Sequence, residues 1–296
     1  TTVAQDNNTL VLNGKVSDNQ LKYASYLTVV PEGGSVTGSG SKLTVKDAEA
    51  ITVYVSAATD YKNTFWNENK TDDYYYRTGE TDDELAERVS AVVEKAVESG
   101  YETVKASHLA DYQELFNRVE LDLGQTVSDK TTDKLLEAYK NNSASKAEKR
   151  QLEVMLFQYG RYLTIASSRE DSQLPSNLQG VWNFLTNPPW ASDYHMNVNL
   201  QMNYWPTYST NLAECALPLI DYIDSLREPG KITAKIYNGV DVGFSAHTQN
   251  TPFGWTCPGW SFSWGWSPAA VPWIIQNCWE YYDLLHHLLV KRQLQR

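Results

Sequence analysis

The stretch from residue 174 to residue 206, LPSNLQGVWNFLTNPPWASDYHMNVNLQMNYWP, constrains the fold of this chain more than any other feature. It is dense in Asn, Gln, Trp, Tyr and Pro and contains no Lys, Arg or Glu. A solvated helix face has the opposite composition, because charged and polar side chains cover it. The stretch is therefore predicted to be something other than a surface helix.

The centre of this stretch alternates with a period of two residues. Polar side chains occupy one parity and apolar side chains the other. The polar set is Asp193, His195, Asn197, Asn199, Gln201 and Asn203, and the apolar set is Tyr194, Met196, Val198, Leu200, Met202 and Tyr204. If the chain is extended here, one edge forms hydrogen bonds and the other is apolar. We expect an extended segment that lines a pocket and becomes helical near Gln201.

Amide and imidazole side chains both donate and accept hydrogen bonds, which suits a neutral polyhydroxylated ligand such as a sugar. Three flanking tryptophans, Trp182, Trp190 and Trp205, offer flat apolar surfaces for the C–H face of a pyranose. The alternative is a structural ladder that satisfies the backbone of a long loop, since buried amides usually belong to satisfied networks. Composition alone leaves both interpretations open.

Residues 1–65 contain short runs rich in Val, Thr and Tyr that predict β-strands, separated by turns with Gly, Ser, Asp and Lys. The runs cover residues 9–16, 21–30, 42–47 and 50–61. Strands at this spacing are typical of part of a β-sandwich. We expect this region to be a scaffold, followed by a polar surface loop at residues 66–83.

The apolar spacing is helical beyond this loop. Thr81 and Glu84 form a sequence pattern typical of a capping box, and Gly100 is expected to end the helix that they open. Pro229 and Gly230 are expected to stop a later helix. Helices are predicted at residues 83–100, 101–119, 128–142, 146–169, 212–228, 230–239 and 268–289. The helix at 146–169 is expected to bury Leu152, Met155, Leu156, Tyr159, Leu163 and Ala166.

The composition excludes several classes of protein. The hydrophobic content of 42% with 12% aromatic residues is typical of a globular chain. A net charge of −11 without a basic patch argues against nucleic acid and anionic membranes as partners, and no apolar run reaches the length of a membrane span. The spacing of the three cysteines, Cys215, Cys257 and Cys278, does not match a metal site. We expect them to be small buried side chains, with a single disulfide between two of them as the alternative.

The runs NLQGVWN and PPWASDYHMNVNLQMNYWP resemble the signature of glycoside hydrolase family 95, the 1,2-α-L-fucosidases and their relatives. Further similarity lies at residues 52–63, 108–124 and 251–282, in the family's order. The resemblance implies a multidomain α+β fold. In this division, residues 1–82 are the end of an N-terminal β-sandwich domain, residues 83–128 are a helical linker, and residues 129–296 are the first part of an (α/α)6 toroid.

The family resemblance also implies a chemistry, the inverting hydrolysis of terminal α-L-fucosyl linkages in oligosaccharides or glycans. Glycoside hydrolysis normally needs two carboxyl groups, but the stretch at residues 174–206 contains only one, that of Asp193. In the family, an Asn amide polarised by a distant Asp activates the water, and a downstream Glu is the general acid. The matching motif assigns catalysis to Asn197 and Asn199 and sugar binding to His195.

The aromatic loop at residues 251–273 provides further candidates, because the equivalent family loop contributes a Trp to the sugar site. Trp264 and Trp266 are the predicted binding tryptophans, although any single tryptophan of the loop, taken alone, is more often a packing residue than a ligand contact. His247 and Thr248, just before the loop, are predicted to bind substrate, with packing as the equal alternative. Asp193 and His195 without a third partner make a weak metal site, so no metal and no cofactor are expected.

The family's acid Glu lies in a motif like S-P-E-N and its Asp in one like D-G-N-F-G, and neither occurs here. The nearest segment, Ser267-Pro268-Ala269, has no carboxylate. We therefore expect an incomplete portion of a family 95 enzyme that has little or no activity alone. The alternatives are a non-catalytic carbohydrate-binding or degenerate homologue and an α-L-galactosidase. The resemblance favours an extracellular or cell-surface bacterial protein, although the chain opens without a signal peptide.

Overall fold

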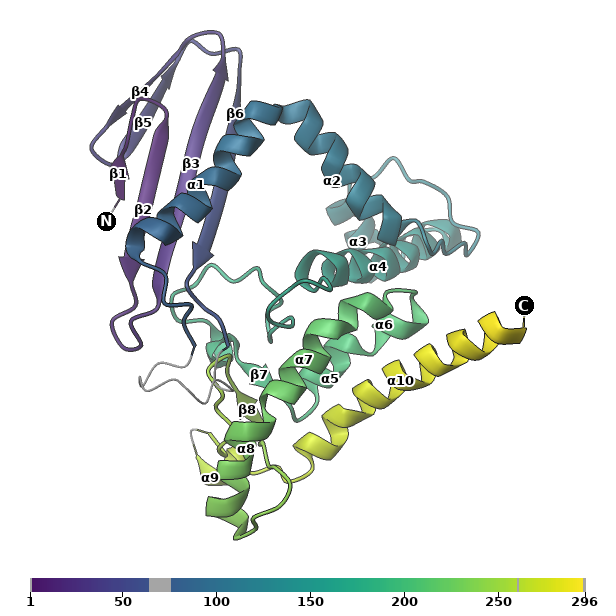
Figure 1. Cartoon of the computed structure of the whole chain (residues 1–296). Coiled ribbons are helices and arrows are strands. Elements are labelled where there is room, and N and C mark those ends of the chain that lie inside the picture. The colour runs from purple at the N-terminus through teal and green to yellow at the C-terminus, as the bar shows by residue number, and fades with distance from the viewer. Residues whose placement is uncertain (1, 64–75, 260, 295–296) are drawn as a thin grey trace. The chain divides into compact units, whose positions relative to one another are not determined.

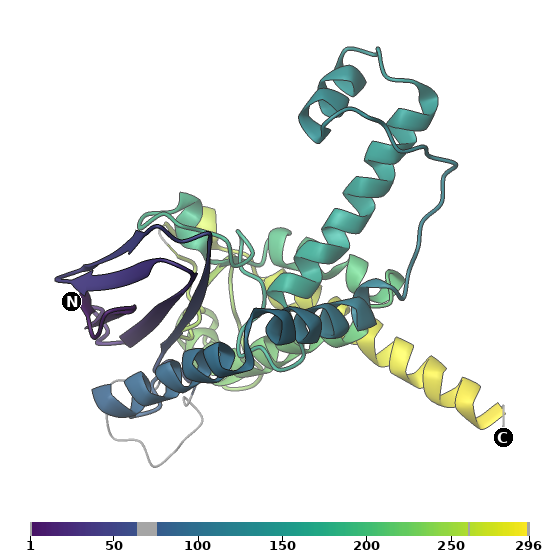
Figure 2. The same cartoon turned by 90° about the horizontal axis from the view of Figure 1, so that it is seen from above.

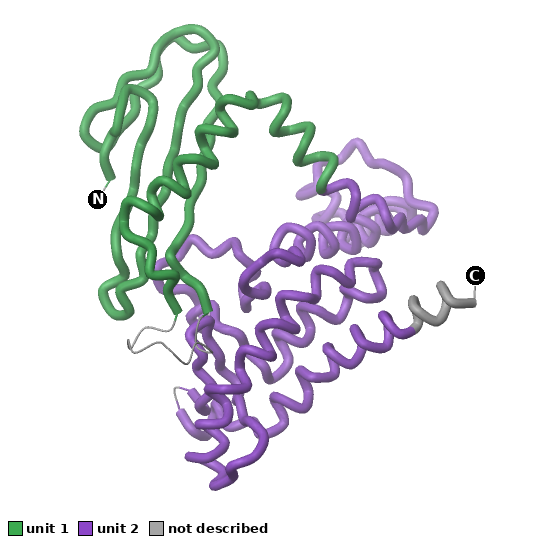
Figure 3. Tube along the Cα trace, in the orientation of Figure 1, with its two compact units in different colours: residues 1–111 green, residues 112–296 purple. Residues whose placement is uncertain are grey.

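Figure 1 shows the computed structural model of the chain, which describes residues 2–63, 76–259 and 261–294. The chain divides into two compact units, Thr1–Asp111 and Tyr112–Arg296 (Figure 3). A sheet at the N-terminus is followed by helices, as predicted. Most of the surface loop predicted at residues 66–83 lies outside the described residues. The predicted division into three domains stays a prediction.

The first unit contains an antiparallel sheet with the strand order β1-β2-β3-β6. Its strands are β1 (Thr2–Ala4), β2 (Thr9–Lys15), β3 (Lys22–Glu32) and β6 (Ala50–Thr59). A hairpin of β4 (Ser35–Ser39) and β5 (Lys42–Lys46) connects β3 to β6. The four predicted runs are confirmed as β2, β3, β5 and β6, and the structure adds the short strands β1 and β4.

Helix α1 (Asp82–Ser99) covers one face of this sheet (Figure 1). Leu85 and Val89 pack with Ala24 of β3 and Ala58 of β6. The predicted capping box is confirmed, because the Glu84 N–H donates to Thr81 Oγ1 at 3.2 Å and the Thr81 N–H donates to the Glu84 carboxylate at 2.7 Å. Gly100 ends the helix with a φ of 77°.

Replacement of Thr81 by alanine should lower the free energy of unfolding by about 1 kcal/mol, because a backbone N–H of the first turn loses its acceptor. Chemical denaturation followed by circular dichroism measures this change. Thr131→Ala is a matched control, since Thr131 caps α3 (Thr132–Lys140) without a side-chain bond to the helix backbone. Equal losses in the two variants would contradict the prediction.

The second unit is mainly helical, and α2 (Tyr101–Phe116) leads into it from the first. After α3, it contains α4 (Lys146–Ser167), α5 (Asn199–Tyr204), α6 (Pro206–Ser209), α7 (Leu217–Ser225), α8 (Arg227–Thr233), α9 (Phe262–Gly265) and α10 (Ala270–Leu294). Helix α3 lies beside the N-terminal part of α4 (Figure 2). None of the helices in the described ranges is long and apolar enough to cross a membrane.

The main core of this unit is formed mostly by side chains from α5, α7 and α10, together with the segment just before α5. It includes Met196, Leu200, Tyr204, Leu219, Ile223 and Ile274, each at most 5% exposed. A smaller cluster joins Leu115, Ile165, Leu212 and Cys215. All three cysteines are free thiols in the structure, and Cys215 is fully buried.

Two sequence-based expectations about the helices are wrong. Pro229 and Gly230 lie inside α8, which begins at Arg227 and is followed by the π-turn Ala234–Asn238. Proline is tolerated there because the first turn of a helix has no acceptor for its N–H groups. Gly239, with a φ of 67°, ends the element instead.

The predicted apolar face of α4 is also wrong over much of its length. Leu156 and Tyr159 are 74% and 58% exposed, whereas Arg161 and Ile165 are buried. Apart from its contact with α3, the helix packs through its C-terminal half, where Ile165 joins the cluster around Leu212. The 3.6-residue period located the helix, but it did not identify the face that is covered.

Candidate functional site

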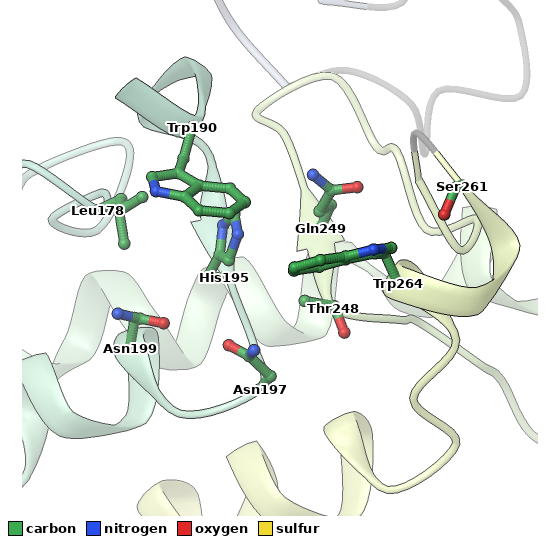
Figure 4. A pocket seen from close by; sticks show the side chains of 9 residues that line it. All are labelled: Leu178, Trp190, His195, Asn197, Asn199, Thr248, Gln249, Ser261 and Trp264. Carbon is green, nitrogen blue, oxygen red and sulfur yellow. The ribbon is translucent and has the colours of Figure 1, made fainter. Parts of the chain in front are cut away.

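A cleft of about 510 Å³ lies within the second unit, between two segments far apart in the sequence (Figure 4). The first segment contributes Leu178, Trp190, His195, Asn197 and Asn199. The second contributes Thr248, Gln249, Ser261 and Trp264. Five of the seven predicted site residues therefore line one cavity: Asn197, Asn199, His195, Thr248 and Trp264.

Backbone pairing brings the two segments together. Strand β7 (Tyr194–His195) pairs antiparallel with β8 (Gln249–Asn250), so that His195 lies opposite Gln249. The Met196 N–H also donates to the Thr248 carbonyl at 2.7 Å. This short ladder fixes the imidazole of His195 beside the polar side chains of the second segment.

The predicted extended segment is shorter than the alternation indicated. The chain turns after His195 and α5 begins at Asn199, two residues before the expected position near Gln201. Residues three or four apart share a face of a helix, so the parity rule no longer applies. Gln201 is accordingly fully buried and donates to the Met196 carbonyl at 2.7 Å, whereas Met202 is 51% exposed.

The amides of Asn197 and Asn199 lie on the turn and at the start of α5, and both point into the cleft (Figure 4). Neither side chain forms a hydrogen bond with another residue in the described part of the chain. A structural ladder would use both amides to satisfy the backbone. Their free donors and acceptors instead favour the ligand-binding interpretation.

His195 is held by a neighbouring carboxylate. Its Nδ1 atom contacts Oδ1 of Asp193, and both residues are less than 10% exposed. A carboxylate accepts hydrogen bonds, so the contact assigns the proton to Nδ1 and leaves Nε2 for a ligand. Asp193 therefore orients the imidazole instead of lining the cleft itself.

The residues before Asp193 have an unusual backbone. Trp190, Ala191 and Ser192 are consecutive non-glycine residues with φ values of 55°, 56° and 50°. Left-handed helical geometry costs roughly 1–2 kcal/mol per residue, and such strain occurs preferentially at functional sites. Here the turn places the Trp190 ring edge-on to His195, with centroids 5.6 Å apart.

Two aromatic rings form walls of the cleft. Trp190 and Trp264 are 50% and 77% exposed, and their centroids lie 6.4 Å apart. Such rings combine a broad apolar surface with a polar N–H. The cleft therefore offers flat apolar surfaces beside neutral hydrogen-bonding groups.

Two predicted binding residues lie outside the lining of the cleft. His247 is fully buried, stacks on Trp266 with centroids 4.5 Å apart, and accepts a hydrogen bond from the Ser267 N–H at 3.0 Å. Trp266 also stacks on Phe262. Burial lowers the pKa of His247 and favours the neutral ring. Thr248 lines the cleft, whereas its chain neighbour His247 is held in the buried stack with Trp266.

The sequence did not identify Gln249 and Ser261 as lining residues. Gln249 is placed by strand pairing with His195, which no local pattern predicts. Gly259 provides the room for it, because a Cβ atom there would lie 1.7 Å from Gln249 Oε1. The only local sequence signal for this arrangement is the glycine itself, which adopts a φ of 95° in the structure.

The cleft is electrically neutral as far as it is described. Its described lining contains no Asp, Glu, Lys or Arg, and Asp193 is engaged with His195. Among the side chains that are described, those of residues 2–63, 76–259 and 261–286, no three His, Cys, Asp or Glu groups are arranged to hold a metal ion. The arrangement suits a neutral ligand with many hydroxyl groups.

Comparison with known proteins gives matches over most of the chain. Residues 100–287 match the model of the glycosyl hydrolase family 95 catalytic domain, and residues 1–64 match that of the glycosyl hydrolase family 65 N-terminal domain. Alpha-L-fucosidase 2 of Arabidopsis thaliana is 35% identical over 268 residues, which are 88% of this chain and 30% of that protein.

Two fungal proteins are similar to a comparable degree. Probable alpha-fucosidase A of Aspergillus niger is 35% identical over 88% of this chain and 32% of its own length. Its counterpart in Aspergillus oryzae is 34% identical over 75% of this chain and 30% of its own length. The chain thus spans about a third of the length of the curated relatives it matches.

Proposed function

This chain belongs to glycoside hydrolase family 95, and from that premise we propose that its cleft serves the hydrolysis of terminal α-L-fucosyl linkages in oligosaccharides or glycans. The reaction inverts the anomeric carbon, and residues 129–296 form the first part of an (α/α)6 toroid. Residues 1–82 end a β-sandwich domain, and residues 83–128 link the two. The names of the relatives support the choice of sugar.

One observation carries this proposal: the amides of Asn197 and Asn199 are free and face a neutral cleft with tryptophan walls. Sugar hydroxyls bind to Asn199, Thr248 and Nε2 of His195, while Asn197 and Asn199 together hold the attacking water. An amide alone is not a base and needs a partner carboxylate. The described lining has none, so the general acid and the polarising Asp must come from elsewhere.

The hydrolysis of 2′-fucosyllactose tests this proposal. The 296-residue chain alone should release little or no fucose, whereas a longer polypeptide that adds the two carboxylates should release the β-anomer first. Nuclear magnetic resonance of the released sugar distinguishes the anomers. Measurable turnover by the 296-residue chain would contradict the claim that it lacks the general acid. Initial release of the α-anomer would contradict the claim that the reaction inverts the anomeric carbon.

A non-catalytic saccharide-binding protein is the second candidate, because the cleft lacks a described carboxylate. This candidate predicts that saccharides bind to the cleft and that no polypeptide containing it hydrolyses them. Calorimetric binding of 2′-fucosyllactose, compared with its turnover by the longer polypeptide, separates the two candidates.

Removal of the Asp193 carboxylate should weaken L-fucose binding to the 296-residue chain by roughly tenfold, by analogy with the lower end of the loss seen when the partner that orients a metal-binding histidine is removed. Asp193→Ala frees the imidazole, whereas Asp193→Asn keeps an oxygen that accepts from Nδ1. Calorimetry measures affinity, and the ¹⁵N shifts of His195 report the tautomer. Unchanged shifts and affinity in Asp193→Ala would refute the positioning role.

A further inference from the structure

A second cavity, of about 350 Å³, lies between the C-terminal half of α4, residues 176–182 and α5. We call it the α4–α5 cavity. It shares no lining residue with the cleft described above. Its described lining contains no charged side chain, so it suits a neutral ligand. Its volume lies at the small end of the range for ligand sites.

Trp182 forms a flat wall of this cavity, and its ring is supported from one side. A Cβ atom at Gly180 would lie 2.3 Å from Cζ3 of Trp182, so the indole packs directly on the glycine backbone. Gly180 has a φ of 66°, a conformation that other residues rarely adopt. The side chain of Trp182 is nevertheless 46% exposed. One face of the indole therefore packs on the glycine backbone, while part of the ring remains accessible to a ligand. We call this ring the Trp182 platform.

Two amides present free acceptors beside this platform. The Nδ2 of Asn203 donates to the Asn177 carbonyl at 3.2 Å, and the Nε2 of Gln179 donates to the Pro189 carbonyl at 3.3 Å. These bonds fix both amides. The side-chain oxygens of Asn203 and Gln179, and the indole N–H of Trp182, have no hydrogen-bond partner in the described part of the chain.

The inner end of the cavity is rigid and uncharged. The Tyr204 hydroxyl interacts with Ser168 Oγ and accepts from the Ser176 N–H, both at 2.8 Å. Burial raises the pKa of Tyr204 to about 12, so the hydroxyl stays protonated at neutral pH. A ligand here meets a fixed neutral surface, which keeps the entropy cost of binding low.

We propose that the α4–α5 cavity is a second saccharide-binding site, in which a pyranose stacks on Trp182 and its hydroxyls bind to Gln179 and Asn203. The platform, the two free oxygens and the absence of described lining charges carry this assignment. The proposal does not depend on hydrolysis in the cleft. Helix α5 contributes Asn199 to the lining of the cleft and Asn203 to the lining of the α4–α5 cavity.

Titration of the 296-residue chain with lactose tests this site, since lactose is a neutral disaccharide with exposed C–H faces. The Nε1–H signal of Trp182, assigned by its loss in Trp182→Phe, should shift together with the side-chain signals of Gln179 and Asn203. Trp182→Ala should raise the dissociation constant about tenfold, which corresponds to ~1.4 kcal/mol. Trp182→Tyr keeps a flat ring and should stay within about threefold of the parent.

Two controls separate this site from its surroundings. Phe184→Ala removes an aromatic ring that is 92% exposed in the same segment but does not line the cavity, and it should leave lactose binding unchanged. His195→Ala impairs the cleft and should also leave the Trp182 shift intact. If Trp182→Ala unfolds, the exposed Asn203→Ala replaces it. A Trp182 signal that lactose does not move, or equal effects of Trp182→Ala and Phe184→Ala, would overturn the proposal.

Discussion

Replacement of Asn197 or Asn199 by alanine should lower the turnover of 2′-fucosyllactose roughly 10²–10⁴-fold, the range typical of groups that move or orient a reacting proton. The assay uses an active polypeptide that contains this chain together with the missing carboxylates. In the proposed mechanism each amide holds the attacking water, and the nearby Gln201 amide cannot replace it, because Gln201 is fully buried and bonded to Met196.

The same substitutions should leave folding intact. Neither amide bonds to another described residue, so truncation leaves no unsatisfied buried partner. Equal thermal midpoints of variant and parent check this point. Asn117→Ala serves as a control, since Asn117 is an exposed amide outside the cleft. Unchanged turnover would remove the amides from the mechanism, and lost stability would restore the structural-ladder interpretation.

Capping residues in the sequence correctly predicted helix ends that are fixed by hydrogen bonds between near neighbours in the chain. Thr81, Glu84 and Gly100 set the limits of α1 through hydrogen bonds within a few residues, and the structure contains these bonds. Pro229 misled the prediction because its effect depends on where the helix begins. Helix α8 begins at Arg227, which puts Pro229 in its first turn, and no local signal marks that start.

The burial of helix faces was harder to predict. Leu156 and Tyr159 fit an apolar stripe on α4, yet both are exposed, and the charged Arg161 is buried in their place. Periodicity indicates which side chains share a face. It does not indicate which neighbour covers that face, because this depends on contacts with α2 and with residues beyond α6.

The residues of the candidate site likewise fall into two groups, those that a sequence motif identified and those that only the folded structure brings to the cleft. His195, Asn197 and Asn199 lie close together in the sequence, and one motif was enough to find them. Gln249 and Ser261 reach the cleft only through the pairing of β7 with β8 and the path of the aromatic loop. His247 and Thr248 are neighbours in the chain, yet only Thr248 lines the cleft, and no local pattern distinguishes the two side chains.

The buried Arg161 should be the most sensitive position for stability in the second unit. The residue is 2% exposed, and its guanidinium has no carboxylate partner among the described residues. It binds oxygen atoms from four backbone carbonyls and one amide instead. These are the carbonyls of Leu115, Phe116, Val119 and Thr210 and the Oε1 of Gln158, at 2.7–3.4 Å.

These contacts explain why a charge is tolerated there. The carbonyls of Leu115 and Phe116 belong to the last turn of α2, where the helix has no donors of its own and carries a partial negative charge. Burial lowers the pKa of Arg161, but an arginine remains protonated at neutral pH. The guanidinium therefore satisfies the end of one helix from the side of another.

Arg161→Met should lower the free energy of unfolding by about 3 kcal/mol or more, because it leaves several buried carbonyls without donors while it keeps most of the side-chain volume. Arg161→Lys keeps the charge but not the planar set of donors, and it should fall between methionine and the parent. Urea denaturation followed by tryptophan fluorescence measures the losses.

Arg227→Met provides the matched control, since the Arg227 side chain is 53% exposed and forms a surface ion pair with Asp224. Arg227→Met should lower the free energy of unfolding much less than Arg161→Met does. If both methionine variants unfold at the same urea concentration, the carbonyls around Arg161 find other donors and its hydrogen bonds do not hold α2 to α4. If lysine restores full stability, the charge alone suffices and the planar geometry of the guanidinium is unnecessary.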